Sequence, residues 1–196
     1  MTALVLASAS PARLATLRSA GLQPSVVVSG VDESVVSGLP PAELALRLAE
    51  LKCDAVADGV TDGSLVLGCD SVLDLDGEAL GKPDDAADAV RRWRAMRGRS
   101  GVLLTGNCLR DTAAGTRAAA TASTVVHFAE VSDAEIAAYV ATGEPLQVAG
   151  AFTVDGLGGA FVTGIEGDHH NVVGLSLPLL RDLIAELGHT WTDLWS

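Results

Sequence analysis

A carboxylate and a lysine stand at two points of the chain where the neighbouring residues restrict their positions. Asp70 follows the apolar segment 65–67, so we expect it at the end of a buried strand. A carboxylate there can hold a metal ion or orient a water molecule, although a turn aspartate that only caps the next element would have the same position. Lys82 lies between Gly81 and Pro83. This setting favours a fixed point charge, and the alternative is an ordinary turn lysine.

Hydroxyl groups and an arginine surround the predicted start of the first helix. Ser8 and Ser10 precede Pro11, and Arg13 lies in the first turn. Ser10 fits the N-cap and Pro11 the first helical position. The free N–H groups of a helix N-terminus bind phosphate, and an arginine adds a two-pronged contact. The alternative is a plain cap with a surface arginine. The segment is not a P-loop, because the Gly-x4-Gly-Lys-Ser/Thr pattern is absent.

Two other chemistries have weak support. Asp168, His169 and His170 are adjacent, but neighbouring side chains are expected to diverge, and no further histidine or cysteine is spaced to complete a transition-metal shell. The Gly-x-Ser-x-Gly motif of serine hydrolases is also absent. The cysteines have no metal-like spacing, so we expect free thiols at Cys53, Cys69 and Cys108.

Apolar periodicity indicates the elements that would position these side chains. A strand around Leu6 leads into the first helix, which Gly21 ends, and Pro41 begins a long helix. The expected apolar face of that long helix consists of Leu44, Leu48, Leu51 and Ala55. Lys52 lies one position away from this face. The other elements expected are strands at 25–29, 65–67, 102–109, 118–129 and 160–162, a hairpin at 72–80 around Asp76-Gly77, and helices from Asp84, from Ser132 with Glu135 in a capping box, and over 177–187.

Because strands and helices mix without strict alternation, we predict an α/β fold. It would be one domain over residues 1–196, with helices on the faces of a mixed sheet. Hydrophobic residues make up 48% of the chain, which is enough for a buried core. The formal net charge of −12 disfavours nucleic acid as a partner. No apolar run long enough for a membrane span and no signal peptide is evident, so we expect a cytoplasmic protein without a membrane partner.

A series of segments along nearly the whole chain matches the pattern of a known family. The segments are LASASPARLATL at 6–17, VDES at 31–34, LALRLAELK at 44–52, LGCDS at 67–71, DGEALGKP at 76–83, GR at 98–99, TG at 105–106, SDAEIAAYV at 132–140, GEPL at 143–146, AGAF at 149–152 and NVVGLSL at 171–177. In their order and spacing they resemble the Maf family of septum-formation-like nucleotide pyrophosphatases. The sequence departs from the family pattern at Gly101, Val148, Phe152 and Ser176.

This resemblance implies an inosine-triphosphatase-like fold: an elongated mixed sheet with a cleft between two lobes. It implies hydrolysis of nucleoside triphosphates, non-canonical or modified ones included, between the α- and β-phosphates, with Mg²⁺ or Mn²⁺ as cofactor. It further implies a house-cleaning role, a link to cell-division arrest and a homodimer. The alternative is a non-catalytic, nucleotide-binding regulator of septum formation.

The resemblance also implies roles for individual residues. Ser8, Ser10 and Arg13 match the phosphate-binding loop, and the charged cleft residues match Glu33, Lys52, Asp70 and Lys82. Asp70 matches the proton acceptor for water, and Asp70 and Glu33 would hold the metal. A triphosphate carries about four negative charges, so a metal and lysines must neutralise it.

Three further positions are those at which the family tunes its base specificity, and here they hold Ala12, Ser71 and Asp155. Family branches that resemble dTTP and UTP hydrolases carry Arg, Thr and Gln there. An ionised Asp155 can only accept hydrogen bonds, which suits the adjacent N1–H and N2–H of guanine. We therefore expect a guanine-type or modified purine triphosphate, unless Asp155 turns to solvent and backbone groups alone recognise the base.

Overall fold

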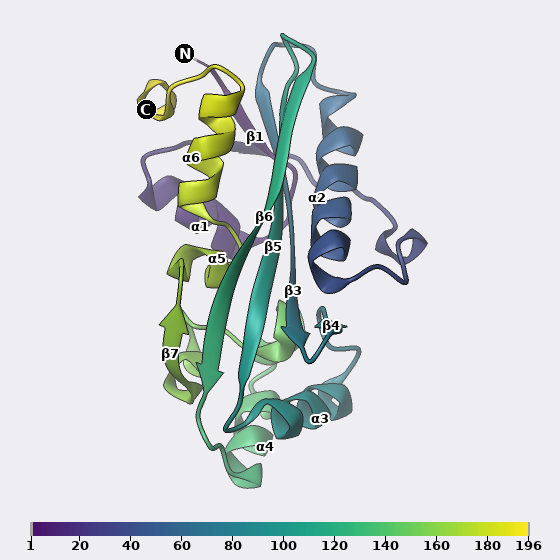
Figure 1. The fold of residues 1–196 in the computed structure, drawn as a ribbon, viewed down its shortest axis with the longest axis vertical. Helices are drawn as coiled ribbons and strands as arrows, with labels where there is room; N and C mark the ends of the chain where they lie inside the picture. The colour runs from purple at the N-terminus through teal and green to yellow at the C-terminus, as the bar shows by residue number, and fades with distance from the viewer. Residues whose placement is uncertain (1, 196) are drawn as a thin grey trace.

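A long mixed β-sheet with helices on both faces forms the framework of the protein (Figure 1). The computed structural model describes residues 2–195. The strands are β1 (Leu4–Leu6), β2 (Ser25–Val26), β3 (Leu65–Leu75), β4 (Glu78–Leu80), β5 (Ser100–Asp111), β6 (Thr116–Phe128) and β7 (Val162–Glu166). The α-helices are α1 (Pro11–Ser19), α2 (Pro41–Ala57), α3 (Ala86–Met96), α4 (Asp133–Ala141), α5 (His169–Val173) and α6 (Leu177–Glu186). Short 3-10 turns are η1 (Glu33–Val35), η2 (Glu144–Gln147), η3 (Ala149–Ala151), η4 (Leu157–Phe161) and η5 (Trp191–Leu194).

The pairing of β3 determines where the sheet is open. The strand order is β2-β1-β3-β5-β6-β7, and β4 also pairs with β3. On one edge, β3 pairs with β5 from Leu65 to Asp74. On its other edge, β1 pairs in parallel with Leu65–Leu67 and β4 pairs antiparallel with Leu73–Leu75. Residues 68–72 therefore form a window, a stretch of β3 edge that neither β1 nor β4 covers.

Helix α2 packs very closely on β3 and β5 because glycines face it. A Cβ on Gly68 would collide with the carbonyl oxygen of Ala49, and one on Gly106 with that of Ala45. The predicted apolar face of α2 is confirmed at Leu48 and is shifted by about one position elsewhere. Its buried residues are Pro41, Ala45, Leu48, Ala49, Cys53, Val56 and Ala57, whereas Leu44 and Leu51 are half-buried and Ala55 is exposed. Because the glycines allow the backbone of α2 to approach the sheet closely, only small residues fit on the helix face between them. In this position of the helix, Lys52 reaches Asp70 in the window.

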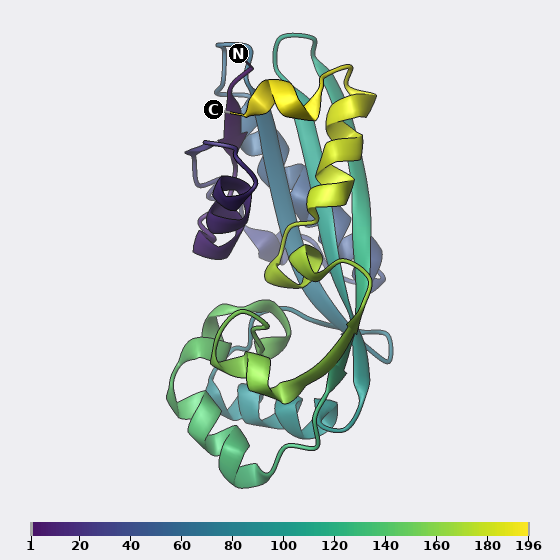
Figure 2. The same ribbon diagram turned by 90° about the vertical axis from the view of Figure 1, so that its left-hand side faces the viewer.

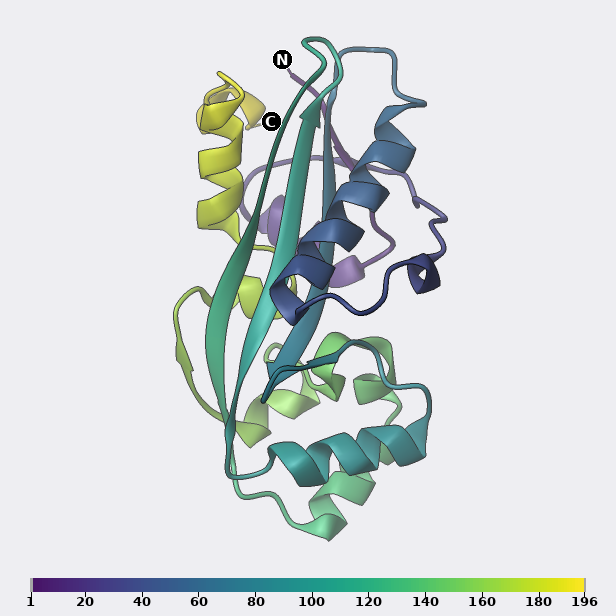
Figure 3. The ribbon, with the colours of Figure 1, turned by 45° about the vertical axis from the view of Figure 1, so that its right-hand side comes forward.

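Two other groups of buried side chains lie at opposite ends of the long strands. Figure 2 shows an upper lobe with α1 and α6 and a lower lobe with α3 and α4, joined by β5 and β6. The upper core, behind α1 and α6, includes Leu6, Leu17, Leu67 and Leu183. Helix α2 covers the other face of these strands (Figure 3).

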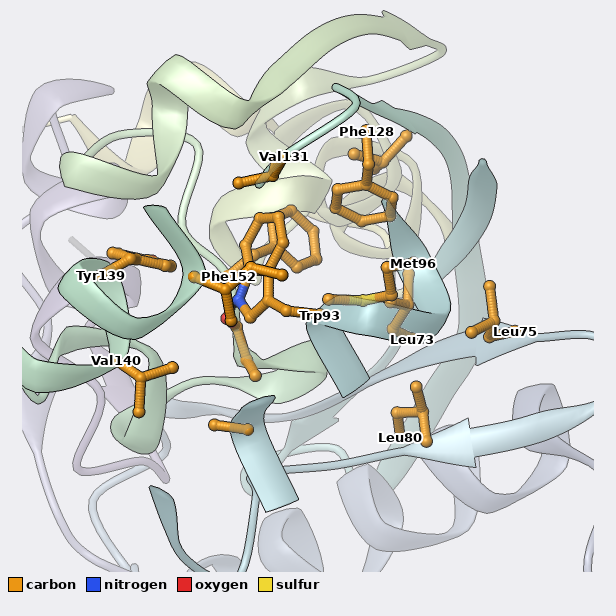
Figure 4. Close-up of a cluster of buried hydrophobic side chains, with 14 of the residues drawn as sticks. Leu73, Leu75, Leu80, Trp93, Met96, Phe128, Val131, Tyr139, Val140 and Phe152 are labelled. Carbon is orange, nitrogen blue, oxygen red and sulfur yellow. Dashed lines mark hydrogen bonds between the residues drawn. The ribbon is translucent and has the colours of Figure 1, made fainter. Parts of the chain in front are cut away.

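The lower core centres on Trp93 (Figure 4). The Trp93 ring packs edge-on against Phe128, Tyr139 and Phe161, with centroids 5.6–5.8 Å apart. Its Nε1 donates to the carbonyl oxygen of Ala151 at 2.7 Å, so the indole is buried without losing its hydrogen bond. Each lobe therefore has its own packed core, and the window lies between them on β3.

The mixed-sheet α/β prediction is confirmed, with differences in detail. The Ser10 and Ser132 caps, the Asp76-Gly77 hairpin and the free thiols are confirmed. The second strand is shorter than predicted, helix α3 begins at Ala86 with Asp85 as its cap, and the strand predicted at 160–162 lies at Val162–Glu166. The strand predicted to end after 67 continues to Leu75. Among residues 2–195, no helix has the length and apolarity to cross a bilayer.

Candidate active site

Asp70 lies in the middle of the window and not at a strand end as predicted. Side chains alternate along a strand, so Asp70 shares the α2 face with Gly68 while Ser71 points to the opposite face. Asp70 is 8% exposed. A ligand at the free edge of β3 can thus reach a carboxylate on one face and a hydroxyl on the other.

Lys52 joins two carboxylates across the window. Its Nζ lies 2.5 Å from Oδ1 of Asp70 and 2.7 Å from Oε1 of Glu33. The side chains of Lys52 and Asp70 are each 12% exposed, whereas that of Glu33 is 55% exposed. Asp32 caps the η1 turn that carries Glu33 by accepting from the Ser34 N–H at 3.0 Å. Three predicted site residues from distant parts of the sequence therefore meet.

The environment of Asp70 changes its acidity. Burial raises the pKa of the Asp70 carboxyl above its usual value, and the repulsion from Glu33 adds to this effect. The positive charges of Lys52 and Arg13 act in the opposite direction but do not cancel the effect of burial. A carboxylate with a raised pKa is a stronger base than an exposed aspartate.

Arg13 organises a second cluster on the α1 side of the window. Its Nη1 donates to Ser8 Oγ at 3.0 Å and its Nη2 to Ser71 Oγ at 3.1 Å. Its Nε donates to the carbonyl oxygen of Gly174 at 2.8 Å. Ser10 caps α1 by accepting from the backbone N–H of Arg13 at 3.3 Å. These bonds fix a guanidinium beside the start of a helix, where the N-terminal donors favour an anion.

The carboxylates fit a divalent cation of the kind that the family resemblance implies. Oxygen atoms of Asp70 and Glu33 converge on one positive group, the Nζ of Lys52, and such oxygens are the ligands that Mg²⁺ and Mn²⁺ prefer. Asp70 and Glu33 are therefore the residues that would hold the ion.

Lys82 lies on the lower-lobe side, directly after β4. It is exposed and makes no ion pair within residues 2–195. Its loop is held in place, because the Gly81 carbonyl accepts from Arg92 Nη1 at 2.6 Å and from the Gly150 N–H at 3.0 Å. The cation is thus carried on a fixed loop with a free side chain.

Two of the three predicted specificity residues line one cavity, and the third does not. A cavity of about 430 Å³ lies against α1 and α5, and its lining includes Ala12 and Asp155. Ser71 instead bonds Arg13 and lies 2.9 Å from Thr105 Oγ1. The structure therefore places Ser71 with the Arg13 cluster.

Glu144 is a site-supporting residue that sequence analysis missed. Its carboxylate accepts from Tyr139 Oη and Thr153 Oγ1 at 3.0 and 2.5 Å, and from the N–H groups of Leu157 and Gly158, both at 3.1 Å. These contacts bracket the loop that carries Asp155. The sequence offered only Gly143-Glu144-Pro145, which marks a helix end.

The histidine pair also differs from expectation. The rings of His169 and His170 do not diverge, since their centroids are 3.8 Å apart. Ligand atoms of Asp168, His169 and His170 lie within 4.8 Å of one another. The first turn of the short helix α5 brings them together, with Asp168 as its N-cap.

Comparisons with known proteins identify the family to which the chain is similar. Residues 3–187 match the family described as Maf-like protein. The chain is 64% identical over 194 residues to a protein of Streptomyces coelicolor named nucleoside triphosphate pyrophosphatase, covering 98% of this chain and 94% of that relative. It is 52% identical over 194 residues to a protein of the same name from Thermosynechococcus vestitus, covering 99% and 98%.

A solved structure, a nucleoside-triphosphatase described as a dITP/XTP pyrophosphatase from Mycobacterium abscessus, is 18% identical with a TM-score of 0.42, covering 66% of this chain and 76% of that one. The family match spans nearly the whole chain, and the full-length relatives share half or more of its residues. This chain therefore belongs to the Maf-like protein family.

Proposed function

We propose that the protein hydrolyses nucleoside triphosphates to the monophosphate and pyrophosphate with the help of a divalent cation. The observation that carries this proposal is the buried Asp70 in the β3 window. Lys52 joins it to Glu33, and Arg13 is close enough for its positive charge to lower the pKa of Asp70. Support also comes from the two relatives above, both named nucleoside triphosphate pyrophosphatase.

Asp70 acts as the proton acceptor in this proposal. Its Oδ1 accepts from Lys52, and its Oδ2 takes no hydrogen bond from residues 2–195, so Oδ2 is the atom that receives the proton of the attacking water. Water adds to the α-phosphorus, the bond to the bridging oxygen breaks, and pyrophosphate leaves. Asp70 and Glu33 would hold a divalent ion, which would supply charge neutralisation and help to activate the water.

The cationic residues bind the phosphate chain. Arg13, fixed by Ser8 and Ser71, presents its guanidinium beside the α1 N-terminus, and Lys82 offers a point charge from the lower lobe. Lys52 can exchange its carboxylate contacts for the pyrophosphate that forms. We assign to Asp155 the recognition of the base and expect a guanine-type or modified purine triphosphate, because an ionised carboxylate fits the N1–H and N2–H pair of guanine.

Family membership supports four further parts of the proposal: a house-cleaning role, a cytoplasmic location, a homodimer and a link to cell-division arrest. Light scattering after gel filtration measures the oligomeric state. A deletion strain that divides normally and accumulates no modified nucleotide would contradict both cellular roles.

The test of the activity is a nucleotide panel. The purified protein is incubated with Mg²⁺ or Mn²⁺, and pyrophosphate is detected as phosphate after added pyrophosphatase. We expect release of monophosphate and pyrophosphate. Nucleotide binding without turnover by the folded protein would instead favour a non-catalytic regulator.

A further inference from the structure

The cavity beside α1 has one aromatic wall. Its lining includes the small residues Ala12, Ala15 and Thr16 on the α1 side, and His169, His170 and Val173 on the α5 side. Its volume of about 430 Å³ is within the usual range for small-ligand sites, about 300–1,000 Å³. The two imidazoles are the only aromatic rings in the lining.

The imidazole pair is held in a defined position. The centroids lie 3.8 Å apart with the planes tilted by 41°. Asp168 Oδ1 lies 3.2 Å from His170 Nδ1 and also accepts the His170 backbone N–H at 3.0 Å. The backbone oxygen of Asp168 accepts from Thr124 Oγ1 at 2.9 Å, which anchors the segment to β6.

The cavity adjoins the Arg13 cluster on both walls. Ala12 immediately precedes Arg13 on α1. On the other wall, Val173 precedes Gly174, whose carbonyl accepts from Arg13 Nε at 2.8 Å. A nucleotide whose phosphates contact Arg13 therefore has this cavity directly beside it for its base.

We propose that His169 and His170 form a stacking platform for the nucleobase, with Ala12 on the opposite wall leaving the space that the base occupies. The inference rests on the proposed function and deepens it. Stacking on aromatic rings tolerates every base, so the platform supplies affinity, and the larger purine ring gains more from it than a pyrimidine. Asp155, on the same cavity, supplies the hydrogen-bonding pattern.

The variants are His169→Ala, His169→Phe and the double change His169→Ala with His170→Ala. His169 is exposed, so its replacement leaves the core intact. The matched control is His127→Ala, which removes an imidazole that pairs with Glu166 at 3.0 Å outside the cavity. The readouts are KM and kcat for GTP and dTTP, the Ki of inorganic tripolyphosphate, and the Kd of α,β-methylene-GTP.

For His169→Ala we expect the KM for GTP and the Kd of the GTP analogue to rise about 5- to 150-fold, the range that loss of base stacking produces. The rise for dTTP should be smaller, kcat should change little, and the Ki of tripolyphosphate, which has no base, should stay the same. His169→Phe should restore most of the affinity.

The platform is overturned if the double variant binds the GTP analogue like the wild type. It is also overturned if the tripolyphosphate Ki rises as much as the KM for GTP, since a general distortion then explains the loss. Failure of the proposed function has a different signature, because the wild type would then release no pyrophosphate from any nucleotide. The Kd series still decides the platform in that case.

Discussion

Lys52 and Asp70, one from helix α2 and one from strand β3, form an ion pair of 2.5 Å in the only stretch of β3 edge that neither β1 nor β4 covers. Both side chains are 12% exposed. Loss of Lys52 would leave the buried Asp70 carboxylate without its cation, which is strongly destabilising, whereas Lys52 keeps Glu33 as a partner when Asp70 is neutral. The close packing of α2 on Gly68 is what brings the lysine within reach.

Replacement of the proposed base should remove activity while the fold remains. We expect Asp70→Asn to lower kcat by about 10²–10⁴, the usual contribution of a general base. Pyrophosphate release measures the loss, and circular dichroism together with binding of α,β-methylene-GTP checks the fold. A folded variant that turns over like the wild type would exclude Asp70 as the base.

The raised pKa of Asp70 can be measured in the metal-free protein. Burial raises the pKa of this carboxyl, whereas a bound cation would lower it. Without metal, Asp70 should therefore take up its proton at a higher pH than an ordinary aspartate does. A pH titration of its carboxyl carbon by NMR, with Asp70→Asn to assign the signal, measures this pKa, and a value at or below that of an exposed aspartate would contradict the effect of burial.

The same shift affects stability. A folded state with the higher pKa binds the proton more tightly than the unfolded state, so this group stabilises the protein as the pH falls and costs stability near neutral pH. Asp70→Asn should accordingly melt no lower than the wild type at neutral pH. A marked fall in Tm there would contradict the sign of the shift.

Loss of either lysine or of metal should reduce turnover, for different reasons. Lys52→Ala removes the partner of two carboxylates, so both kcat and Tm should fall. Lys82→Ala changes an exposed side chain, so kcat should fall while Tm stays the same. Excess EDTA should abolish activity and added Mg²⁺ or Mn²⁺ restore it.

The matched control for the lysines is Arg181→Ala, which removes an exposed cation on α6 that pairs with Asp182. Unchanged kinetics in both lysine variants would remove them from the mechanism. Full activity in EDTA would remove the metal.

Local sequence signals predicted most elements but not the window. The caps at Ser10 and Ser132 depend on neighbouring residues, and both are present. The small and polar residues of the run 68–71 predict a strand end. The run continues as strand because β5 pairs along its whole length. This pairing joins segments that are far apart in the sequence, so the residues 68–71 alone do not predict it.

Residue types and spacing alone single out Asp70 and leave Glu33 and Lys52 as ordinary surface residues, and it is the resemblance to the Maf family that implies all three as cleft residues. The contacts of Lys52 could not be predicted, because they depend on two glycines of the sheet, Gly68 and Gly106, that lie far along the chain and bring α2 close. The histidine platform was missed for a similar reason, because the cavity exists only where α1 and α5 meet.

Gly68, one of the two glycines against which α2 packs, should not tolerate a side chain. A Cβ on Gly68 would collide with backbone of α2, including the Ala49 carbonyl and the Cys53 N–H. We expect Gly68→Ala to lower the free energy of unfolding by about 1–3 kcal/mol, as overpacking does, and to lower activity because Lys52 and Asp70 separate. Urea denaturation measures the former.

The control is Gly59→Ala, where the added Cβ would lie 3.6 Å from the nearest oxygen, that of Val56. That is ordinary contact, so this variant should keep both stability and activity. If Gly68→Ala is as stable and active as Gly59→Ala, the tight contact of α2 does not position the site.

The loop that carries Asp155 should depend on Glu144. Removal of its carboxylate by Glu144→Ala leaves the N–H groups of Leu157 and Gly158 without their acceptor. We expect the KM for the preferred purine triphosphate to rise more than kcat falls, and the KM discrimination between GTP and dTTP to narrow. Glu144→Asp, which keeps the carboxylate on a side chain one methylene shorter, should restore part of the KM difference between GTP and dTTP. Equal loss for both nucleotides would indicate a merely structural role.

Asp155 itself should decide between bases. Its position on the cavity wall lets an ionised carboxylate face the N1–H and N2–H of guanine. Against uracil or thymine it would face carbonyl oxygens and provide no donor, and an unmet buried acceptor costs about 1–3 kcal/mol. We expect kcat/KM for GTP or 7-methyl-GTP to exceed that for dTTP and UTP, and Asp155→Gln, which adds a donor, to shift the preference towards dTTP and UTP by about tenfold. If dTTP or UTP is the best substrate of the wild type, Asp155 does not select guanine.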